Sequence, residues 1–177
     1  MSEQPGRYQR APSGLVASML VLLLAIAGFV VFRAVFRGDQ DVPVPTVDYS
    51  LVLRQAREAG IVAAPAPDPM PAKWRATSVR YSAQSRTWHL GILTASDAYV
   101  GIEESPADRQ VLVDRSLGKG AAQGAPVTLD GVQWASWSQG PAYALTRDAG
   151  SGIVLVGGPA GKTAVTELAG HLSLGSG

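Results

Sequence analysis

The feature that most constrains this chain is an uncharged apolar run from residue 14 to residue 32. As an α-helix rising about 1.5 Å per residue, the run is roughly 28 Å long, which matches the hydrocarbon thickness of a bilayer. Arg33 follows it, and an arginine at this depth can extend its guanidinium to the lipid headgroups. The pattern predicts a transmembrane helix over 14–36, preceded by a short cytoplasmic tail over 1–13.

A cleaved signal peptide is the alternative explanation of the apolar run. Ala25-Ile26-Ala27 has the A-x-A pattern of a signal-peptidase site. Cleavage near Ala27 would produce a secreted protein whose new N-terminus is the apolar stretch GFVVFRAVF. Because such an N-terminus would be poorly soluble, the sequence favours an uncleaved anchor.

The orientation of the predicted span rests on weak signals. Two arginines precede the run and two follow it, so the positive-inside rule does not decide. The short N-terminal tail, and the absence of Lys or Arg between Arg37 and Arg54, favour an N-terminus inside the cell. We therefore expect a single-pass plasma-membrane protein whose C-terminal part lies outside the cytoplasm.

The residues after the span are predicted to form one globular domain. A proline-containing stalk is expected over 37–47, an α+β domain over 48–173 and a disordered tail over 174–177. The 177-residue chain is 46% hydrophobic and 16% charged, which suits a membrane segment plus a packed domain. It has no cysteine, so disulfides and thiolate metal sites are excluded.

Alternation of apolar and polar residues begins at Trp74 and predicts strands. The segments WRATSVRYS, TWHLGIL and AYVGIEE follow it, AYALTR and GIVLV are expected to form a hairpin, and Asp130-Gly131 predicts a type I′ hairpin turn. We expect an antiparallel sheet of about six strands with two or three packing helices. The large residues of the core and its rim should be the tryptophans Trp74, Trp88, Trp134 and Trp137.

Three helices are expected beside this sheet. The first spans 48–59, capped by Thr46 or Asp48. The second starts with Pro106 in its first turn and ends before Gly118, and the third runs from 161 to 172 with Thr163 or Gly161 as its cap.

The stretch GIVLVGGPAGKTAV, residues 152–165, resembles a phosphate-binding loop. The motif G-x-x-x-x-G-K-[ST] requires four residues between its glycines, but only three separate Gly157 from Gly161. We therefore interpret Gly157, Gly161, Lys162 and Thr163 as a false match in which a strand passes through a turn into a helix. No nucleotide is expected, and no other cofactor is indicated.

No catalytic motif is recognisable in the sequence. His89 falls on the strand face opposite Trp88 and Leu90, and Glu103 and Glu104 are neighbours on a strand, so they point to opposite faces. With two histidines and no cysteine, a three-histidine metal site is excluded. We expect no catalytic residues, no metal and no enzyme activity.

Several segments together resemble a family of actinobacterial single-pass membrane proteins labelled domain of unknown function 4245. They are the tail PGRYQRAPSG, the span, VDYSLVLRQAREAG, PAKWRATSVRYS, TWHLGIL and TLDGVQWASWSQ. The resemblance covers nearly the whole chain. It implies one span followed by a C-terminal domain beyond the membrane, and it brings no reaction with it.

The sequence thus predicts a membrane-anchored extracytoplasmic module that binds or interacts without catalysis. Its expected partners are the lipid bilayer and another membrane or envelope protein. A net charge of +1 gives no electrostatic reason to expect nucleic acid. The alternatives are an envelope hydrolase with an active site that matches no motif, and a secreted protein cleaved near Ala27.

Overall fold

The computed structural model describes residues 12–36 and 45–174, with side chains over 16–32 and 45–174. The chain divides into two units, Met1–Pro43 and Val44–Gly177, each described here by itself. Of the predicted segments, residues 1–11 of the tail, 37–44 of the stalk and 175–177 of the C-terminal tail lie outside the described residues.

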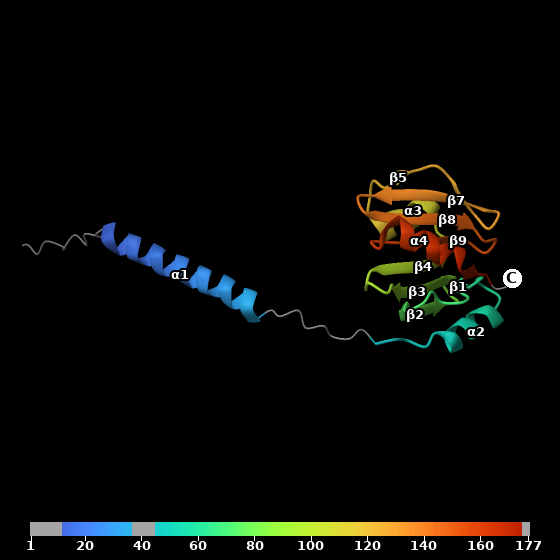
Figure 1. Ribbon diagram of the computed structural model, residues 1–177, viewed down its shortest axis with the longest axis horizontal. Helices are drawn as coiled ribbons and strands as arrows, with labels where there is room; N and C mark the ends of the chain where they lie inside the picture. Colours follow the sequence, from blue (N-terminus) through green and yellow to red (C-terminus); the bar gives the residue numbers. More distant parts are fainter. Residues whose placement is uncertain (1–11, 37–44, 175–177) are drawn as a thin grey trace, which may run out of the picture. The chain divides into compact units, whose positions relative to one another are not determined.

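The first unit contains helix α1 (Pro12–Phe36), which covers the predicted span and the two residues before it (Figure 1). Every described side chain of α1, from Val16 to Phe32, is exposed. In the parts of the chain that the structure describes, no helix is long and apolar enough to cross a membrane.

The second unit is an α+β domain built on an eight-stranded sheet in which every pairing is antiparallel. The strand order is β2-β3-β4-β9-β8-β7-β5, and β6 also pairs with β7 (Figure 1). The strands are β2 (Arg75–Ser82), β3 (Thr87–Leu93), β4 (Tyr99–Ser105), β5 (Ala122–Gln123), β6 (Val127–Leu129), β7 (Val132–Gln139), β8 (Ala142–Asp148) and β9 (Ile153–Gly158).

The α+β class is confirmed, but the sheet is larger than the six strands expected. The difference arises from short strands such as β5, whose two residues are too few to show an alternating pattern. A separate two-stranded ladder joins β1 (Ala66–Pro67) to β10 (Leu172–Ser173). The predicted hairpin turn is confirmed, since Asp130 and Gly131 both have positive φ, 48° and 79°, between paired Leu129 and Val132.

Three helices accompany the sheet: α2 (Ser50–Glu58), α3 (Arg109–Leu117) and α4 (Gly161–Gly170). The cap predicted for α2 was wrong: Tyr49 is the N-cap and no side chain caps the helix, although Asp48 just before it accepts a bond from the Ser50 amide at 2.9 Å. The prediction that α3 starts at Pro106 was wrong: Asp108 is the N-cap and accepts a bond from the Gln110 amide. The cap predicted for α4 was also wrong, because Ala160 precedes the helix and no side chain caps it.

The two faces of the sheet bury different clusters. The face that we call the α4 face packs the larger core, with Trp88, Leu145 and Val156 against Leu168 of α4. The opposite face, the α3 face, buries a smaller cluster, Leu112, Val113, Trp137, Ala144 and Leu155. Helix α3 contacts β7, β8 and β9.

On the α4 face, two buried polar groups tie the segment before β2 to the sheet. Glu104 is 1% exposed, and its carboxylate accepts bonds from the amides of Ala63 at 3.0 Å and Ala64 at 2.9 Å. The Ser151 hydroxyl donates to the same carboxylate. The indole N–H of Trp88 donates to the Pro65 carbonyl at 2.9 Å.

Arg57 of α2 joins this segment to the end of the domain. Its guanidinium donates to the Ala64 carbonyl and to the carbonyl and hydroxyl of Ser173, at 3.2 to 3.4 Å. Ser173 lies in β10, which pairs with β1. The Arg57 side chain therefore connects the first helix of the domain to its last strand.

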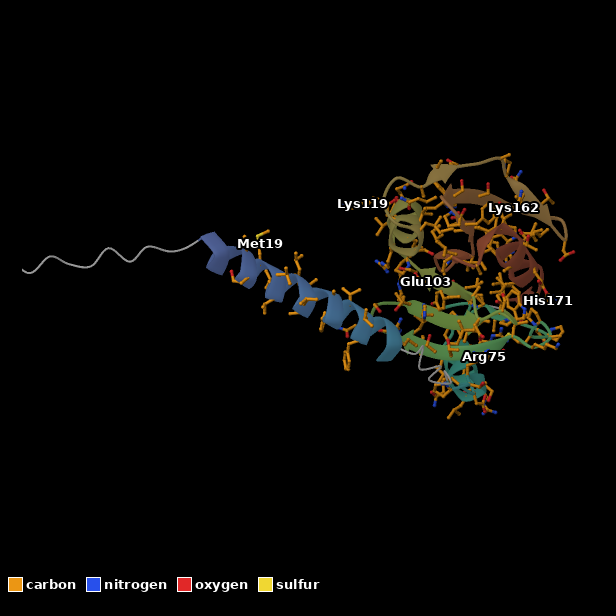
Figure 2. All side chains as sticks on the ribbon, turned by 60° about the vertical axis from the view of Figure 1, so that its left-hand side comes forward. Met19, Arg75, Glu103, Lys119, Lys162 and His171 are labelled. Carbon is orange, nitrogen blue, oxygen red and sulfur yellow. The ribbon has the colours of Figure 1, made fainter. Side chains whose placement is uncertain are left out.

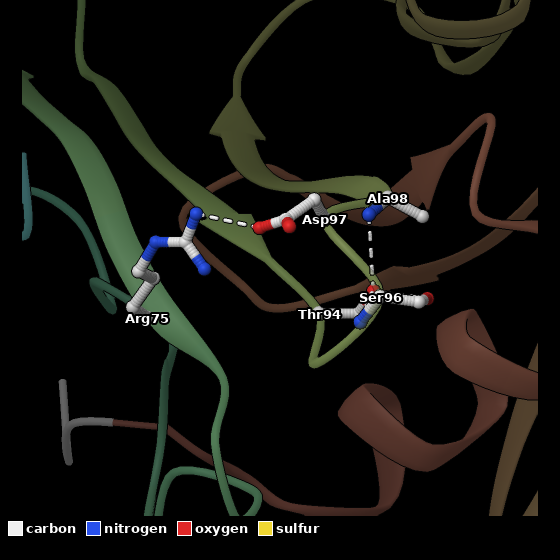
Figure 3. Close-up of polar contacts among 5 residues, drawn as sticks. All are labelled: Arg75, Thr94, Ser96, Asp97 and Ala98. Carbon is white, nitrogen blue, oxygen red and sulfur yellow. Dashed lines mark hydrogen bonds and ion pairs between the residues drawn. The ribbon is translucent and has the colours of Figure 1, made fainter. Parts of the chain in front are cut away.

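The turn between β3 and β4 is held by side chains that Figure 3 shows. Arg75 forms an ion pair with Asp97 at 2.6 Å, and Thr94 Oγ1 accepts a bond from the Ala98 amide at 3.1 Å. Asp97 has a φ of 60°, the left-handed conformation that aspartate tolerates in tight turns. This turn sets the start of β4, where Tyr99 begins the strand.

Candidate functional site

The residues of the false phosphate-loop match lie in three different settings. Gly157 is buried inside β9, where an added Cβ would lie 2.6 Å from Cβ of Ala144. Gly161 and Thr163 lie in the first turn of α4. Lys162, labelled in Figure 2, is exposed, with its amine 5.9 Å from the centre of the Tyr143 ring. The glycine that would open the loop is thus part of the sheet.

Replacing Lys162 with alanine should change the free energy of unfolding by less than about 1 kcal/mol. Among the described residues, this side chain has only the cation–π contact, and exposed contacts of this kind contribute about 0.5–1 kcal/mol. Urea unfolding of both proteins measures the change. A loss of several kcal/mol would show that Lys162 has a role that its position does not explain.

A row of charged side chains crosses the α3 face of the sheet. Arg80 of β2 lies opposite His89 of β3, and His89 lies opposite Glu103 of β4. Nδ1 of His89 is 3.4 Å from Oε1 of Glu103, and both side chains are largely covered, at 16% and 23% exposed. Figure 2 labels Glu103 on this part of the sheet. Beyond Glu103, the next residue across the sheet is the apolar Leu155 of β9, which packs with Leu112 and Val113 of α3.

Two hydroxyl groups approach the other nitrogen of His89. The Ser78 hydroxyl oxygen lies 3.5 Å from Nε2, and the Tyr99 hydroxyl oxygen lies 3.4 Å from it. Because Nδ1 lies at ion-pair distance from the Glu103 carboxylate, we assign the imidazole proton to Nδ1, which leaves the Nε2 lone pair to both hydroxyls. Four side chains from three strands therefore form one polar cluster, Ser78, His89, Tyr99 and Glu103.

Two glycines form the floor beneath this cluster. A Cβ on Gly91 would lie 2.4 Å from Oγ of Ser78 and 3.1 Å from the Tyr99 ring. A Cβ on Gly101 would lie 3.1 Å from the Tyr99 hydroxyl. These positions lack side chains, so the tyrosine ring and the serine hydroxyl can lie close to the sheet.

The row borders a cleft of about 620 Å³. Its lining includes Arg80, His89 and Glu103 from the sheet and Arg115 from α3. Neither Arg80 nor Arg115 has a hydrogen-bond or ion-pair partner among the described residues. The lining also includes the polar residues Tyr81, Ser82, Thr87, Glu104 and Ser105.

Burial raises the pKa of Tyr99 above its ordinary value of 10.0, the Glu103 charge raises it further, and Arg80 opposes the shift. Because the folded protein then holds this proton more tightly than the unfolded chain, the free energy of unfolding should fall as pH rises above 10. Phenolate absorbance should show a tyrosine ionising above pH 10 that is absent from Tyr99→Phe. An unchanged titration curve in this variant would contradict the assignment. Tyr49→Phe serves as a comparison, because burial also raises the pKa of Tyr49.

The sequence placed several of these residues correctly without indicating that they meet. His89 lies on the face opposite Trp88, and Glu103 and Glu104 point to opposite faces, as predicted. Ser78 and Tyr99 were not identified as site residues, since each lies 10 or 11 positions from His89 in the chain. The signal that could have found them is the pair Gly91 and Gly101, which marks a close approach to neighbouring strands.

Within residues 12–36 and 45–174, no group of three or more His, Asp or Glu side chains is placed to hold a metal ion. The cluster and the cleft beside it nevertheless contain groups that can transfer a proton and bind an anion. The imidazole can accept a proton, the carboxylate can stabilise the resulting charge, and two arginines at the cleft can attract an anion.

Comparison with known proteins gives one match. The model of the family described as "Protein of unknown function (DUF4245)" matches residues 7–172. No curated protein and no solved structure matches the chain.

Proposed function

Since the chain belongs to the DUF4245 family, we propose that it is a membrane-anchored extracytoplasmic module that binds an anionic solute or an acidic group of a partner in the cleft beside Arg80 and Arg115. The observation that carries this proposal is the cleft itself, whose lining includes two arginines that have no acidic partner among the described residues.

The argument for an anchor comes from the composition of α1. The uncharged run over 14–32 lies wholly inside this helix, and its described side chains are exposed and, apart from Ser18, apolar. A helix that is apolar all round is stable only where its whole surface is removed from water, as in a bilayer. The orientation with the domain outside rests on the distribution of arginines in the sequence.

The argument for anion binding comes from the charges at the cleft. Arg80 on β2 and Arg115 on α3 line it from different elements, and no described residue accepts a hydrogen bond from either guanidinium. Guanidinium groups bind carboxylate and phosphate through paired N–H donors. Glu103 is engaged with His89, which reduces its competition for these arginines.

A reporter fused to the C-terminus tests the location. A periplasmic-type reporter, active only outside the cytoplasm, should be active in the fusion. Replacing the run over 14–32 with a polar linker should release the domain from membranes. A fusion that is active only with a cytoplasmic reporter would refute the extracytoplasmic location.

Titration of the full-length protein in detergent micelles with inorganic phosphate tests the binding. Amide resonances of residues around Arg80, His89 and Arg115 should shift in a saturable way. Arg80→Gln and Arg115→Gln should each weaken the apparent affinity by about tenfold, on the order of one charge-assisted hydrogen bond. Arg54→Gln, on the exposed side of α2, is the matched control. If phosphate and a simple carboxylate such as acetate both fail to shift these resonances, the anion site is refuted.

A further inference from the structure

The polar cluster holds a serine, a histidine and a glutamate in line. The Ser78 hydroxyl oxygen is 3.5 Å from Nε2 of His89, whose Nδ1 is 3.4 Å from the Glu103 carboxylate. We propose that Ser78 is a nucleophile activated by His89, that Glu103 orients the imidazole, and that the cluster hydrolyses carboxylic esters. This activity goes beyond the proposed binding function.

The order of the three groups is the one that nucleophilic catalysis requires. A carboxylate at Nδ1 fixes the proton there, so Nε2 keeps its lone pair and can take the proton of the serine hydroxyl. The Ser78–His89 distance is somewhat longer than an ideal hydrogen bond, as is common for nucleophile–base pairs without substrate, and Glu103 lies at ion-pair distance from Nδ1. The register of β2, β3 and β4 sets the arrangement, because His89 and Glu103 are directly opposite and Ser78 is diagonal to His89.

Tyr99 supplies the remaining element, a donor for the oxyanion. Its hydroxyl is 3.4 Å from the same Nε2 and lies over Gly91 together with Oγ of Ser78. The Tyr99 phenol is protonated at neutral pH at its ordinary pKa, and burial raises that pKa further, so the hydroxyl can donate. Strands β3 and β4 have a neighbour on both sides, which engages their backbone amides in the sheet. A donor to the oxyanion on this face of the sheet must therefore come from a side chain.

The reaction balances with water as the only co-reactant. Oγ of Ser78 forms a bond to the ester carbonyl carbon while its proton passes to Nε2 of His89. The C–O bond of the ester then breaks, and the imidazolium gives its proton to the departing alkoxide, which leaves as an alcohol. Water attacks the acyl-serine in the same way, which releases a carboxylic acid and restores the serine.

A fluorophosphonate probe tests the nucleophile without knowledge of the substrate. Full-length protein in detergent micelles should gain one adduct, with loss of fluoride, and peptide mapping should place it on Ser78. Ser78→Ala should abolish labelling, and His89→Asn should slow it by about 100-fold or more, as expected for loss of a general base. Ser138→Ala, an exposed serine of β7 without a histidine contact, should label like the unsubstituted protein. Hydrolysis of p-nitrophenyl acetate should likewise be lost in Ser78→Ala, slowed in His89→Asn and unchanged in Ser138→Ala.

The chain lacks cysteine, which provides a second test. Ser78→Cys introduces a single thiol that a histidine neighbour should activate, since a thiolate beside an imidazole forms at lower pH than a free one. At pH 6 iodoacetamide should alkylate it at least tenfold faster than it alkylates Ser138→Cys, and His89→Asn should remove the difference.

An absence of labelling in the folded unsubstituted protein, or labelling that survives Ser78→Ala, would overturn the proposal. Equal alkylation of the two cysteine variants would also overturn it. None of these outcomes bears on phosphate binding or on the reporter fusion, so the catalytic proposal and the binding proposal fail separately.

Discussion

Replacing Glu104 with alanine should lower the free energy of unfolding by about 3 kcal/mol or more. The carboxylate is 1% exposed and accepts bonds from the amides of Ala63 and Ala64 and from the Ser151 hydroxyl. Its removal leaves two buried N–H groups without an acceptor, and each such group costs about 1–3 kcal/mol. Urea unfolding followed by tryptophan fluorescence measures the loss.

Two further substitutions separate the hydrogen bonds from other effects of this change. Glu104→Gln keeps the size of the side chain but places an amide N–H₂ where one acceptor was, so it should also destabilise, by roughly 1–3 kcal/mol. Glu167→Ala removes an exposed glutamate from α4 and should stay within about 0.5 kcal/mol of the unsubstituted protein. If Glu104→Ala and Glu167→Ala behaved alike, the buried carboxylate would not hold residues 63 and 64 in place.

Replacing Trp88 with alanine should destabilise the domain by about 3–5 kcal/mol, the usual effect of removing a large aromatic side chain from a core. Trp88 is 1% exposed, packs in the larger core and donates to the Pro65 carbonyl. The variant should unfold at a lower urea concentration, and its segment around Pro65 should become sensitive to protease before the rest of the domain.

A graded comparison distinguishes the indole hydrogen bond from the packing of Trp88. Trp88→Phe keeps most of the apolar volume but leaves the Pro65 carbonyl without its donor, so an intermediate loss of about 1–3 kcal/mol is expected. Trp74→Phe, at a half-buried position, should cost less. A larger effect at Trp74 than at Trp88 would mean that the core is centred elsewhere.

The strands, the hairpin and the core tryptophans could be predicted because their signals are local. Asp130-Gly131 specifies its turn through two backbone conformations, and Trp88 and Leu90 mark a buried face by their spacing. The starts of helices were harder to predict. Pro106 is acceptable at a first helical position, yet the Asp108 side chain supplies the cap two residues later.

The polar cluster could not be predicted because it depends on register. Ser78 comes close to His89 only because β2 has an irregularity between Ala76 and Ser78, and such shifts leave no clear mark in a single sequence. Glu104 shows the same limit. Its place on a strand was predictable, but the two amides that it binds come from a segment about 40 residues earlier in the chain.

The contacts of Arg57 give the domain a mechanical property. A pull applied where the chain enters the domain, before α2, loads the Val47–Ala76 backbone bond and, through α2, the Arg57 guanidinium that holds Ser173. The β1–β10 ladder bears part of the same load. The Arg57–Ser173 hydrogen bonds thus connect the first helix of the domain to its last strand. Tension from the N-terminal side should break these bonds before Ala66 and Pro67 separate from β10.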